Sequence, residues 1–398
     1  MAHTLSGRAE TAYQSRILRH LRDDGSLSRV ELAARLDVSR TTVAAEVGRL
    51  TDLGLVTDAG PAASRGGRRS TLVDLDPGLR FVGIDAGATS MRVAVTDGRL
   101  QVLAREVLPD SDIRRGPEAV LADALTMTRE LLAEQGVDRP FGVGIGVPGP
   151  VDFQAGVPVA PPIMPGWDGY PVRDALSREL GCPVLLDNDV NVMALGEQHN
   201  GVARSARDFL FVKIGTGIGC GIVVDRHLYR GADGCAGDIG HIRVETDGPV
   251  CACGNVGCLE AFFGGAALAR DAAAAARSGR SEVLAQLLAE HGRLTAAVVA
   301  EAMSKGDPTS VQLVRDGGRR VGSVLAGLVS FFNPGLIVIG GGLSQLGHTL
   351  LAEVRSVVYR QSLPLATGNL PVVLSELGDD AGVVGAVRLI SDAVYAAS

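Results

Sequence analysis

The sequence predicts an α/β protein in which a small, mainly helical domain precedes two lobes that each combine strands with helices. Three observations support this fold class. The chain has 398 residues, more than one hydrophobic core usually organises. Capping residues and apolar spacing indicate three helices before residue 51. Residues 81–97 and 211–225 form two similar strand–turn–strand patterns, which are typical of two lobes of related design.

The first domain contains two closely spaced helices and a third one upstream. Ser28 and Glu31 are spaced as a capping box for the first of the pair. Its apolar residues are Val30, Leu32, Ala33 and Leu36. Ser39 is placed to cap the next helix, whose inward-facing residues are Val43, Val47 and Leu50. The upstream helix carries Ile17, Leu18 and Leu21.

This arrangement predicts a winged helix-turn-helix that binds DNA. The basic, glycine-rich segment 54–76 indicates a two-stranded wing. The start of the second helix would offer donors to bases and phosphates in a major groove, through Ser39, Arg40, Thr41 and Thr42. Flanking phosphates or a narrow minor groove would meet Arg49, Arg65, Arg68 and Arg69. The alternative is a small protein-interaction domain with solvated arginines.

Composition and charge describe an ordinary globular protein without a membrane segment. The formal net charge is −7, yet residues 1–80 hold 12 arginines against 10 acidic residues. No apolar run reaches the length of a transmembrane helix, and no secretory leader precedes the first domain. We therefore expect a cytoplasmic protein with no membrane partner, whose cysteines stay reduced.

Three glycine-containing turns follow the predicted strands of the two lobes. They contain Asp85, Gly87 and Thr89, then Gly215, Thr216 and Gly217, and finally Gly340, Gly341 and Gly342. Glycines at such turns let backbone N–H groups approach a phosphate, and an acidic residue can position a metal-bound nucleotide. Turn glycines are also common for structural reasons alone. Together, the three clusters outline a nucleotide cleft between the lobes.

Polar residues end a predicted apolar strand in the segment PVLLDNDVNVMALGE, residues 183–197. Asp187, Asn188 and Asp189 stand where this strand gives way to a helix. Carboxylates at such a junction can bind hydroxyl groups, and one can remove a proton from a hydroxyl under attack. Alternatively, Asp189 is simply the helix cap. Trp167, the only tryptophan, either stacks on a ligand or anchors apolar packing.

The segment CACGNVGC, residues 251–258, predicts a metal site. His241, Cys251, Cys253 and Cys258 supply one imidazole and three thiolates, a complete tetrahedral set for zinc. A closed set leaves no position for a reactive water, so we expect a structural Zn²⁺. The alternative is three free thiols in a turn. The other cysteines, Cys182, Cys220 and Cys235, are expected to be packing residues.

Seven motifs in this order resemble the ROK family of sugar kinases and sugar-responsive repressors. They are GIDAGAT, GVGIGVPGPVD, LDNDVNVMALGE, VKIGTGIGCGIVVD, AGDIGHI, CACGNVGCLE and IVIGGGLS. The resemblance covers residues 77–398 and implies an actin-like, hexokinase-like ATPase (ribonuclease H-like) fold of two lobes. It implies a DNA-binding domain at 1–76, a first lobe at 77–187 completed by a C-terminal helix at 380–398, and a second lobe at 188–379.

The resemblance also implies roles for individual residues. The sugar would be held by Asn188, Asp189, Asp238, His241 and Glu260, with Asp189 at the position of the catalytic base. ATP with Mg²⁺ would use the three glycine turns. The chain departs from the kinase pattern D-x-G-G-T-K, because Ala88 replaces the second glycine and Ser90 the lysine. Asp238 replaces the usual glutamate.

These departures favour a regulator over an enzyme. We expect a sugar-responsive transcriptional repressor of carbohydrate metabolism, which binds operator DNA as a homodimer or a dimer of dimers. A sugar or sugar derivative would change its affinity for DNA. The alternative is an ATP-dependent sugar kinase of the glucokinase type with an accessory DNA-binding domain.

Overall fold

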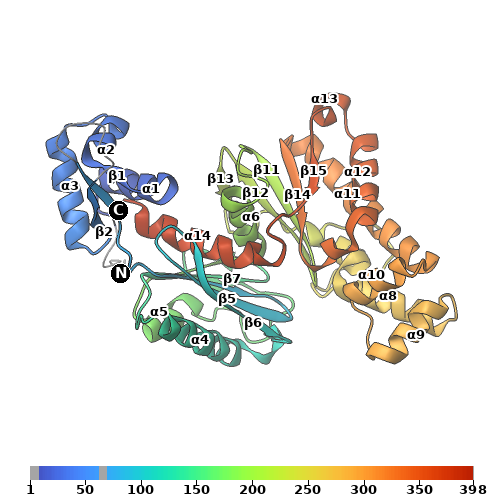
Figure 1. The fold of residues 1–398 in the computed structure, drawn as a ribbon. Coiled ribbons are helices and arrows are strands. Elements are labelled where there is room, and N and C mark those ends of the chain that lie inside the picture. Colours follow the sequence, from blue (N-terminus) through green and yellow to red (C-terminus); the bar gives the residue numbers. More distant parts are fainter. Residues whose placement is uncertain (1–8, 62–69, 398) are drawn as a thin grey trace.

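The computed structural model describes residues 9–61 and 70–397. Figure 1 shows three parts in a row, which we call the head (residues 9–75), the first lobe (81–188 and 381–395) and the second lobe (209–374). The last helix of the first lobe returns to the head (Figure 1). The predicted fold class, a helical head followed by two α/β lobes, is confirmed.

The head has the three predicted helices and both wing strands. Its elements are α1 (Ala12–Asp24), β1 (Leu27–Ser28), α2 (Arg29–Leu36), α3 (Arg40–Asp52), β2 (Val56–Pro61) and β3 (Thr71–Leu75). Ser28 and Glu31 form the capping box, and Ser39 accepts the Thr42 N–H at 3.0 Å. The sequence did not reveal β1, which pairs antiparallel with β3, because two residues are too few to show alternation.

One apolar residue of α2 lies on the wrong face. Leu32 and Leu36 are buried, but Val30 is 44% exposed. Val30 precedes Leu32 by two residues, which places it about 200° around the helix from that side chain. Its inclusion in the apolar face was therefore wrong.

Both lobes contain a five-stranded mixed sheet with the same order of connections. In each sheet, three consecutive strands pair antiparallel. Two further strands lie beside the first of these three and pair in parallel. The first sheet has the order β10–β7–β4–β5–β6, with β4 (Phe81–Ala86), β5 (Ser90–Thr96), β6 (Val102–Pro109), β7 (Gly142–Val147) and β10 (Val184–Asn188). The second has the order β13–β12–β11–β14–β15, with β11 (Phe209–Ile214), β12 (Ile218–Val224), β13 (His227–Tyr229), β14 (Leu336–Gly340) and β15 (Val372–Leu374). A small hairpin joins β8 (Val151–Asp152) and β9 (Val157–Pro158).

Helices cover both sheets. Figure 1 shows α4 (Pro117–Glu134) and α5 (Val172–Leu180) on one side of the first sheet and α14 (Ala381–Tyr395) on the other. Between the sheets lies α6 (Asp189–Asn200), which packs on α14 and β12. The second lobe carries α7 (Leu259–Phe263), α8 (Gly265–Arg277), α9 (Glu282–His291), α10 (Ala296–Ser304), α11 (Pro308–Phe332), α12 (Gly347–Gln361) and α13 (Pro364–Thr367). Short 3₁₀ turns are η1 (Ile113–Arg115), η2 (Ile239–His241), η3 (Gly342–Leu346) and η4 (Gly378–Asp380). Among the described residues, no helix has both the length and the apolarity to cross a membrane.

The helices α6 and α14 are in close contact because both carry glycine at their crossing. A Cβ at Gly385 of α14 would overlap the carbonyl oxygen of Val192 in α6, and one at Gly196 of α6 would overlap that of Ala381. Only the absence of a side chain permits such an approach. The two helices therefore pack backbone to backbone, which leaves little room for one to move independently of the other.

The far end of α14 completes the core of the head. Val387, Ile390, Val394 and Tyr395 of this helix belong to the same apolar cluster as the buried residues of α1, α2 and α3. Tyr395 is fully buried, packs edge-on against Phe81 with ring centroids 5.7 Å apart, and donates to the Gly98 carbonyl at 2.8 Å. The head and the first lobe thus share one hydrophobic core.

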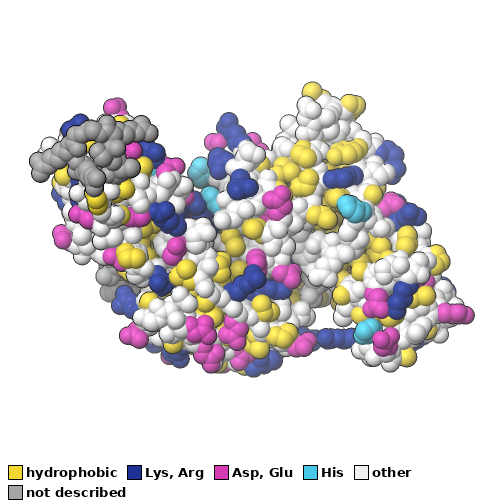
Figure 2. All heavy atoms as spheres, viewed as in Figure 1, with side chains coloured by type: hydrophobic (Ala, Val, Ile, Leu, Met, Phe, Trp, Pro, Cys, Tyr) yellow, Lys and Arg dark blue, Asp and Glu magenta, His cyan; other side chains and the backbone are white. Residues whose placement is uncertain are grey.

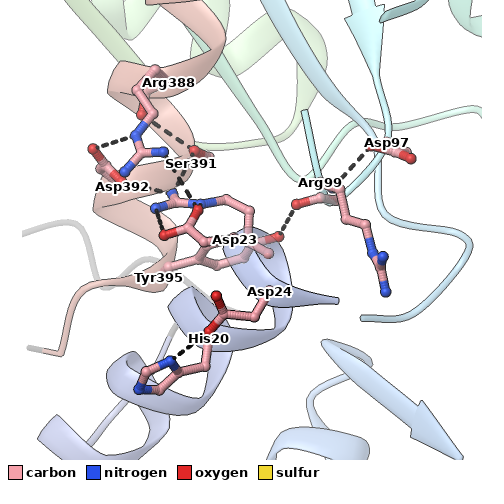
Figure 3. Close-up of polar contacts among 11 residues, drawn as sticks. His20, Asp23, Asp24, Asp97, Arg99, Arg388, Ser391, Asp392 and Tyr395 are labelled. Atoms are coloured by element: carbon pink, nitrogen blue, oxygen red, sulfur yellow. Dashed lines mark hydrogen bonds and ion pairs between the residues drawn. The ribbon is translucent and has the colours of Figure 1, made fainter. Parts of the chain in front are cut away.

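Charged groups surround this shared core (Figure 3). Arg22 of α1 donates to Asp392 of α14 at 2.7 Å, and its guanidinium lies over the Tyr395 ring at 5.6 Å from the centroid. Asp392 also accepts from Arg388 at 2.9 Å, as Figure 3 shows. Each charge at this junction has an opposite neighbour, so the burial of Arg22 is compensated.

His199, at the end of α6, makes this junction sensitive to acid. Burial and the nearby Arg388 lower the pKa of the imidazole to about 4, although Asp392 opposes the shift. The folded state therefore prefers neutral His199, and its contribution to stability is present above pH 6.5 and is lost as the pH falls toward 4. Between pH 7 and pH 5, His199→Gln should remove about 2 kcal/mol of the acid-induced loss in unfolding free energy. Urea unfolding at both pH values measures this difference. An unchanged pH dependence in His199→Gln would contradict the assignment.

Candidate functional site

A cavity between the lobes brings the predicted sugar-binding residues together. It is lined by Asn188, Asp189, Asp238, His241 and Glu260. These residues come from the start of α6, from the segment before and within η2, and from α7. Residues up to 72 positions apart in the chain therefore face one space, which is what a ligand site requires.

The turn from β10 into α6 points Asp189 toward the cavity. The Asn188 side chain accepts the N–H groups of Val190 at 2.9 Å and Asn191 at 3.3 Å, so Asn188 is the helix cap. The alternative in which Asp189 caps the helix is therefore wrong. Asn188 also donates to the Gly149 carbonyl at 2.9 Å. Because Asn188 satisfies the helix end, the Asp189 carboxylate is free for another partner.

That partner is Lys213, which sequence reasoning overlooked. The Lys213 ammonium on β11 contacts the Asp189 carboxylate. Burial disfavours the charge, but Asp189, Asp85 and Glu260 together raise the pKa of Lys213, which therefore stays protonated. One signal was available: a lysine interrupts the apolar strand FLFVKI, and the chain contains only two lysines.

Two further acidic side chains, Asp238 and Glu260, line the cavity. Glu260 accepts the Ile218 N–H at 3.0 Å, and its carboxylate fills the space where Gly217 has no side chain. Burial raises the pKa of both Glu260 and Asp238. Cys235 also lines the cavity and is exposed, so its assignment as a packing residue was wrong. Cys182 and Cys220 are buried.

The predicted nucleotide-binding residues are only partly brought to this cavity. Thr216 and Gly217 line it, together with Ala88. The remaining ones do not: these are Asp85, Gly87, Thr89, Gly215, Gly340, Gly341 and Gly342. Burial raises the pKa of Asp85 to about 6, against the opposing charge of Lys213. Trp167 is fully buried and donates to the Ile113 carbonyl at 3.1 Å, which identifies it as a packing anchor.

The four predicted metal ligands form a compact cluster. The donor atoms of His241, Cys251, Cys253 and Cys258 all lie within 4.8 Å of one another. Cys253 Sγ and Cys258 Sγ are 3.8 Å apart, and Cys251 Sγ lies 3.4 Å from His241 Nδ1. Tetrahedral zinc with ordinary bond lengths would require about 3.8 Å between two sulfurs and about 3.6 Å between sulfur and nitrogen. The donor set therefore fits a tetrahedral ion.

His241 joins this cluster to the cavity. Its Nδ1 faces Cys251, whereas its Nε2 lies 3.8 Å from a carboxylate oxygen of Asp238. The same ring thus has one nitrogen toward the cysteines and the other toward the acidic wall of the cavity. An ion bound at the cysteines would fix the orientation of this wall.

The first turn of α3 is accessible on the head. Arg40 and Thr41 are exposed, and the Ser39 hydroxyl lies 2.8 Å from that of Thr42. Arg49 is exposed and pairs with Glu46 at 2.8 Å. The predicted contacts Arg65, Arg68 and Arg69 lie outside the described residues.

The exposed face of α3 continues with small residues that the sequence reasoning missed. These are Ala44, Ala45 and Gly48. Small side chains let a helix backbone approach a groove closely. Figure 2 shows basic and acidic side chains interspersed on the face in view, so positive charge does not dominate this face of the molecule.

Comparisons with known proteins match both parts of the chain. The ROK family model matches residues 81–393, and a winged helix-turn-helix DNA-binding model matches residues 11–57. The chain is 30% identical to a putative xylose repressor of Caldicellulosiruptor sp. strain Rt8B.4 over 94% of each chain. It is 31% identical to a glucokinase of Thermotoga maritima, and the matched region covers 80% of this chain and 99% of the glucokinase.

A solved structure extends over the head as well as the lobes. It is the crystal structure of a ROK family transcriptional regulator, a homologue of the Escherichia coli MLC protein, with a TM-score of 0.81 and 26% identity over 96% of each chain. The ROK family model matches residues 81–393, which are 313 of the 398 residues. This match establishes the family. This chain is a member of the ROK family with an N-terminal winged helix-turn-helix.

Proposed function

We propose that this protein is a sugar-responsive, DNA-binding transcriptional repressor. The head supplies the DNA-binding unit, and the cavity between the lobes takes a sugar or sugar derivative. The repressor and the regulator named above match the head and both lobes, whereas the glucokinase matches a shorter part of the chain. The observation that carries the proposal is the packing of α6 on α14, which connects the cavity to the head.

This connection consists of α6 and α14. Asp189, the first residue of α6, lines the cavity, and α6 packs along α14 through Gly385. The other end of α14 provides Tyr395 to the core of the head. A sugar that moves the start of α6 would therefore shift α14 and the head with it. Such coupling needs a difference in sugar affinity between two conformations, typically about 1–3 kcal/mol.

We propose a structural Zn²⁺ at His241, Cys251, Cys253 and Cys258. With all four positions filled by protein ligands, the ion would have no open site for a substrate or a reactive water. Its contribution would be to order the loop before α7 and to hold His241 against Asp238. The sugar pocket would then depend on the metal for its shape.

ATP-dependent sugar phosphorylation is the alternative function. Asp189 at the base position and the 31% identity to a glucokinase favour it. Ala88 and Ser90 oppose it, because a methyl group replaces a phosphate-loop glycine and a positive charge is missing. An assay for sugar-dependent ADP formation distinguishes the two functions. Rapid turnover that disappears in Asp189→Asn would contradict the regulator.

We further propose that a homodimer is the DNA-binding form. Two heads are needed to read two half-sites of an operator. Leu365 and Phe331 are 98% and 90% exposed, and Leu363 is 76% exposed. Such apolar side chains favour contact with a second copy.

Substitution of Arg40 tests the DNA-binding role of α3. Arg40→Ala should weaken binding to a DNA fragment from the protein's own upstream region by about 1–3 kcal/mol, because it removes a donor at the start of the recognition helix. Fluorescence anisotropy at fixed salt measures the affinity. Arg277→Ala removes the same charge from the second lobe and should leave binding unchanged. Equal affinities of wild type and Arg40→Ala would reject this interface.

The sugar response is measured with the same DNA fragment. Titration with xylose, glucose and glucose 6-phosphate should identify a ligand that releases the wild-type protein from DNA. No release by any saccharide of a wider panel would refute the proposed response.

A further inference from the structure

Lys213 places a positive charge in the wall of the cavity. Its side chain is 18% exposed, and that of Asp189 is 3% exposed. The ammonium contacts one carboxylate oxygen, Asp189 Oδ2. Within the described residues, the chain's other lysine, Lys305, lies on the surface of the second lobe and pairs with Glu301 at 2.8 Å. Lys213 is therefore the chain's only lysine inside a cavity.

The position of Lys213 matters because it contacts the buried carboxylate of Asp189 and its charge also acts on the half-buried Asp85. Lys213 is the strongest favourable charge near Asp85, and the charge of Asp189 acts on the same group in the opposite direction. A phosphorylating site would need Asp189 free to accept a proton, and a metal ion with nucleotide to balance acidic groups nearby. In this chain, an ammonium already engages Asp189 and supplies a positive charge beside it. The side chains present therefore do not fit a site for Mg²⁺ and ATP.

We propose that Lys213 makes the cavity a receptor for an uncharged sugar that is bound without being phosphorylated. The ammonium donates to the oxygen of one sugar hydroxyl, and the free oxygen of Asp189 accepts the proton of that hydroxyl. Lys213 thus performs the charge-balancing task of a divalent cation. This inference rests on the proposed function, since it names the ligand class of the same cavity.

The charge around Lys213 determines the ligand class. The cavity is lined by three carboxylates, those of Asp189, Asp238 and Glu260, and by one ammonium. A phosphate or carboxylate group on the ligand would meet this acidic wall and would compete with Asp189 for the ammonium. Neutral hydroxyl groups can bind both kinds of side chain. Xylose or glucose therefore fits this cavity better than glucose 6-phosphate.

The two lysines allow a direct test on the wild-type protein. Acetylation with an amine-reactive ester, followed by peptide mass spectrometry, reports Lys213 and Lys305 separately. A neutral sugar at ten times its Kd should slow the acetylation of Lys213 about tenfold and leave Lys305 unchanged. An unchanged rate at Lys213 with xylose or glucose, at a concentration that calorimetry shows to saturate the protein, would overturn the proposal.

Variants test the two roles of the ammonium. Lys213→Met should weaken the binding of the neutral sugar by about 10- to 150-fold, because it removes a hydrogen bond from a charged donor. It should also create a binding site for Mn²⁺, detected by electron paramagnetic resonance, because Asp85 and Asp189 lose their cation. Lys305→Met is the matched control and should behave as wild type in both measurements. Asp189→Asn combined with Lys213→Met should remove the new Mn²⁺ site.

Several outcomes would overturn the inference. These are an unaltered sugar affinity in Lys213→Met, a Mn²⁺ site of equal strength in the cavity of the wild type, and tighter binding of glucose 6-phosphate that depends on Lys213. If Lys213→Met does not fold, the acetylation experiment decides the question. None of these measurements uses DNA, so a failure of operator binding would refute the proposed function and leave the role of Lys213 separately testable.

Discussion

Replacement of Cys258 by serine is expected to abolish stoichiometric zinc and the sugar response together. Cys258 is fully buried in the four-ligand cluster, and a serine hydroxyl is a poor ligand for Zn²⁺ beside two thiolates. Structural zinc has apparent binding free energies of about 10–16 kcal/mol at neutral pH, and much of this is folding free energy of the surrounding segment. Loss of the ion should therefore disorder the wall that carries His241 and Asp238.

The backbone of this segment explains why the expected effect is large. Between η2 and α7, ladder pairing in the described structure is limited to two isolated bridges, Arg243 with Cys258 and Val250 with Val256. Turn hydrogen bonds such as that from the Cys251 N–H to the Asn255 carbonyl at 2.8 Å hold the rest of this loop, and we expect a bound ion to contribute much of its order. Gly257 adopts a φ of +81° and a Cβ there would overlap the Glu245 carbonyl, so the turn admits glycine alone.

Zinc content by elemental mass spectrometry and thermal unfolding with and without sugar measure this effect. Cys235→Ser is the matched control, because Cys235 lines the cavity but lies outside the cluster. It should keep its zinc. A Cys258→Ser protein with one zinc per chain would show that another set of ligands holds the metal.

Tyr395→Ala should destabilise the junction of head and first lobe by about 3–5 kcal/mol. The side chain is fully buried, and its removal leaves a cavity beside Phe81 that the surrounding helices fill only in part. The substitution also removes the ring under the Arg22 guanidinium. Because α14 would then hold the head less firmly, DNA release by sugar should be lost even where sugar still binds.

Tyr395→Phe is the control for this prediction. It keeps the ring and removes the hydrogen bond to Gly98, at an expected cost of about 1 kcal/mol. Urea unfolding gives the stabilities, and anisotropy with labelled DNA gives the response to sugar. A Tyr395→Ala protein that responds to sugar like wild type would show that coupling follows a route other than α14.

Features set by neighbouring residues could be predicted from the sequence. The caps at Ser28 and Ser39 depend on residues three positions away, and the metal cluster depends on spacing within one segment, so both were accessible. The carboxylates of the cavity were placed by the family resemblance. The location of Asp189 at a strand-to-helix junction also follows from the change in periodicity at Asn188.

Features set by long-range packing could not be predicted in this way. The contact between Lys213 and Asp189 joins β11 to α6, and its formation depends on how the second sheet lies against that helix. The exposure of Cys235 likewise depends on the cavity it lines. Nothing local in residues 381–395 indicates that this helix belongs to the core of the head.

The shared core has a consequence for how the protein is made. Arg22 and Asp392 are 370 residues apart, so the DNA-binding unit leaves the ribosome long before its last core residues exist. Until then, the apolar surface of the head that Tyr395 covers in the folded protein remains exposed on the nascent chain. We therefore expect competence to bind DNA to be acquired late in synthesis, and a prematurely truncated chain to release an incomplete head instead of an unregulated repressor.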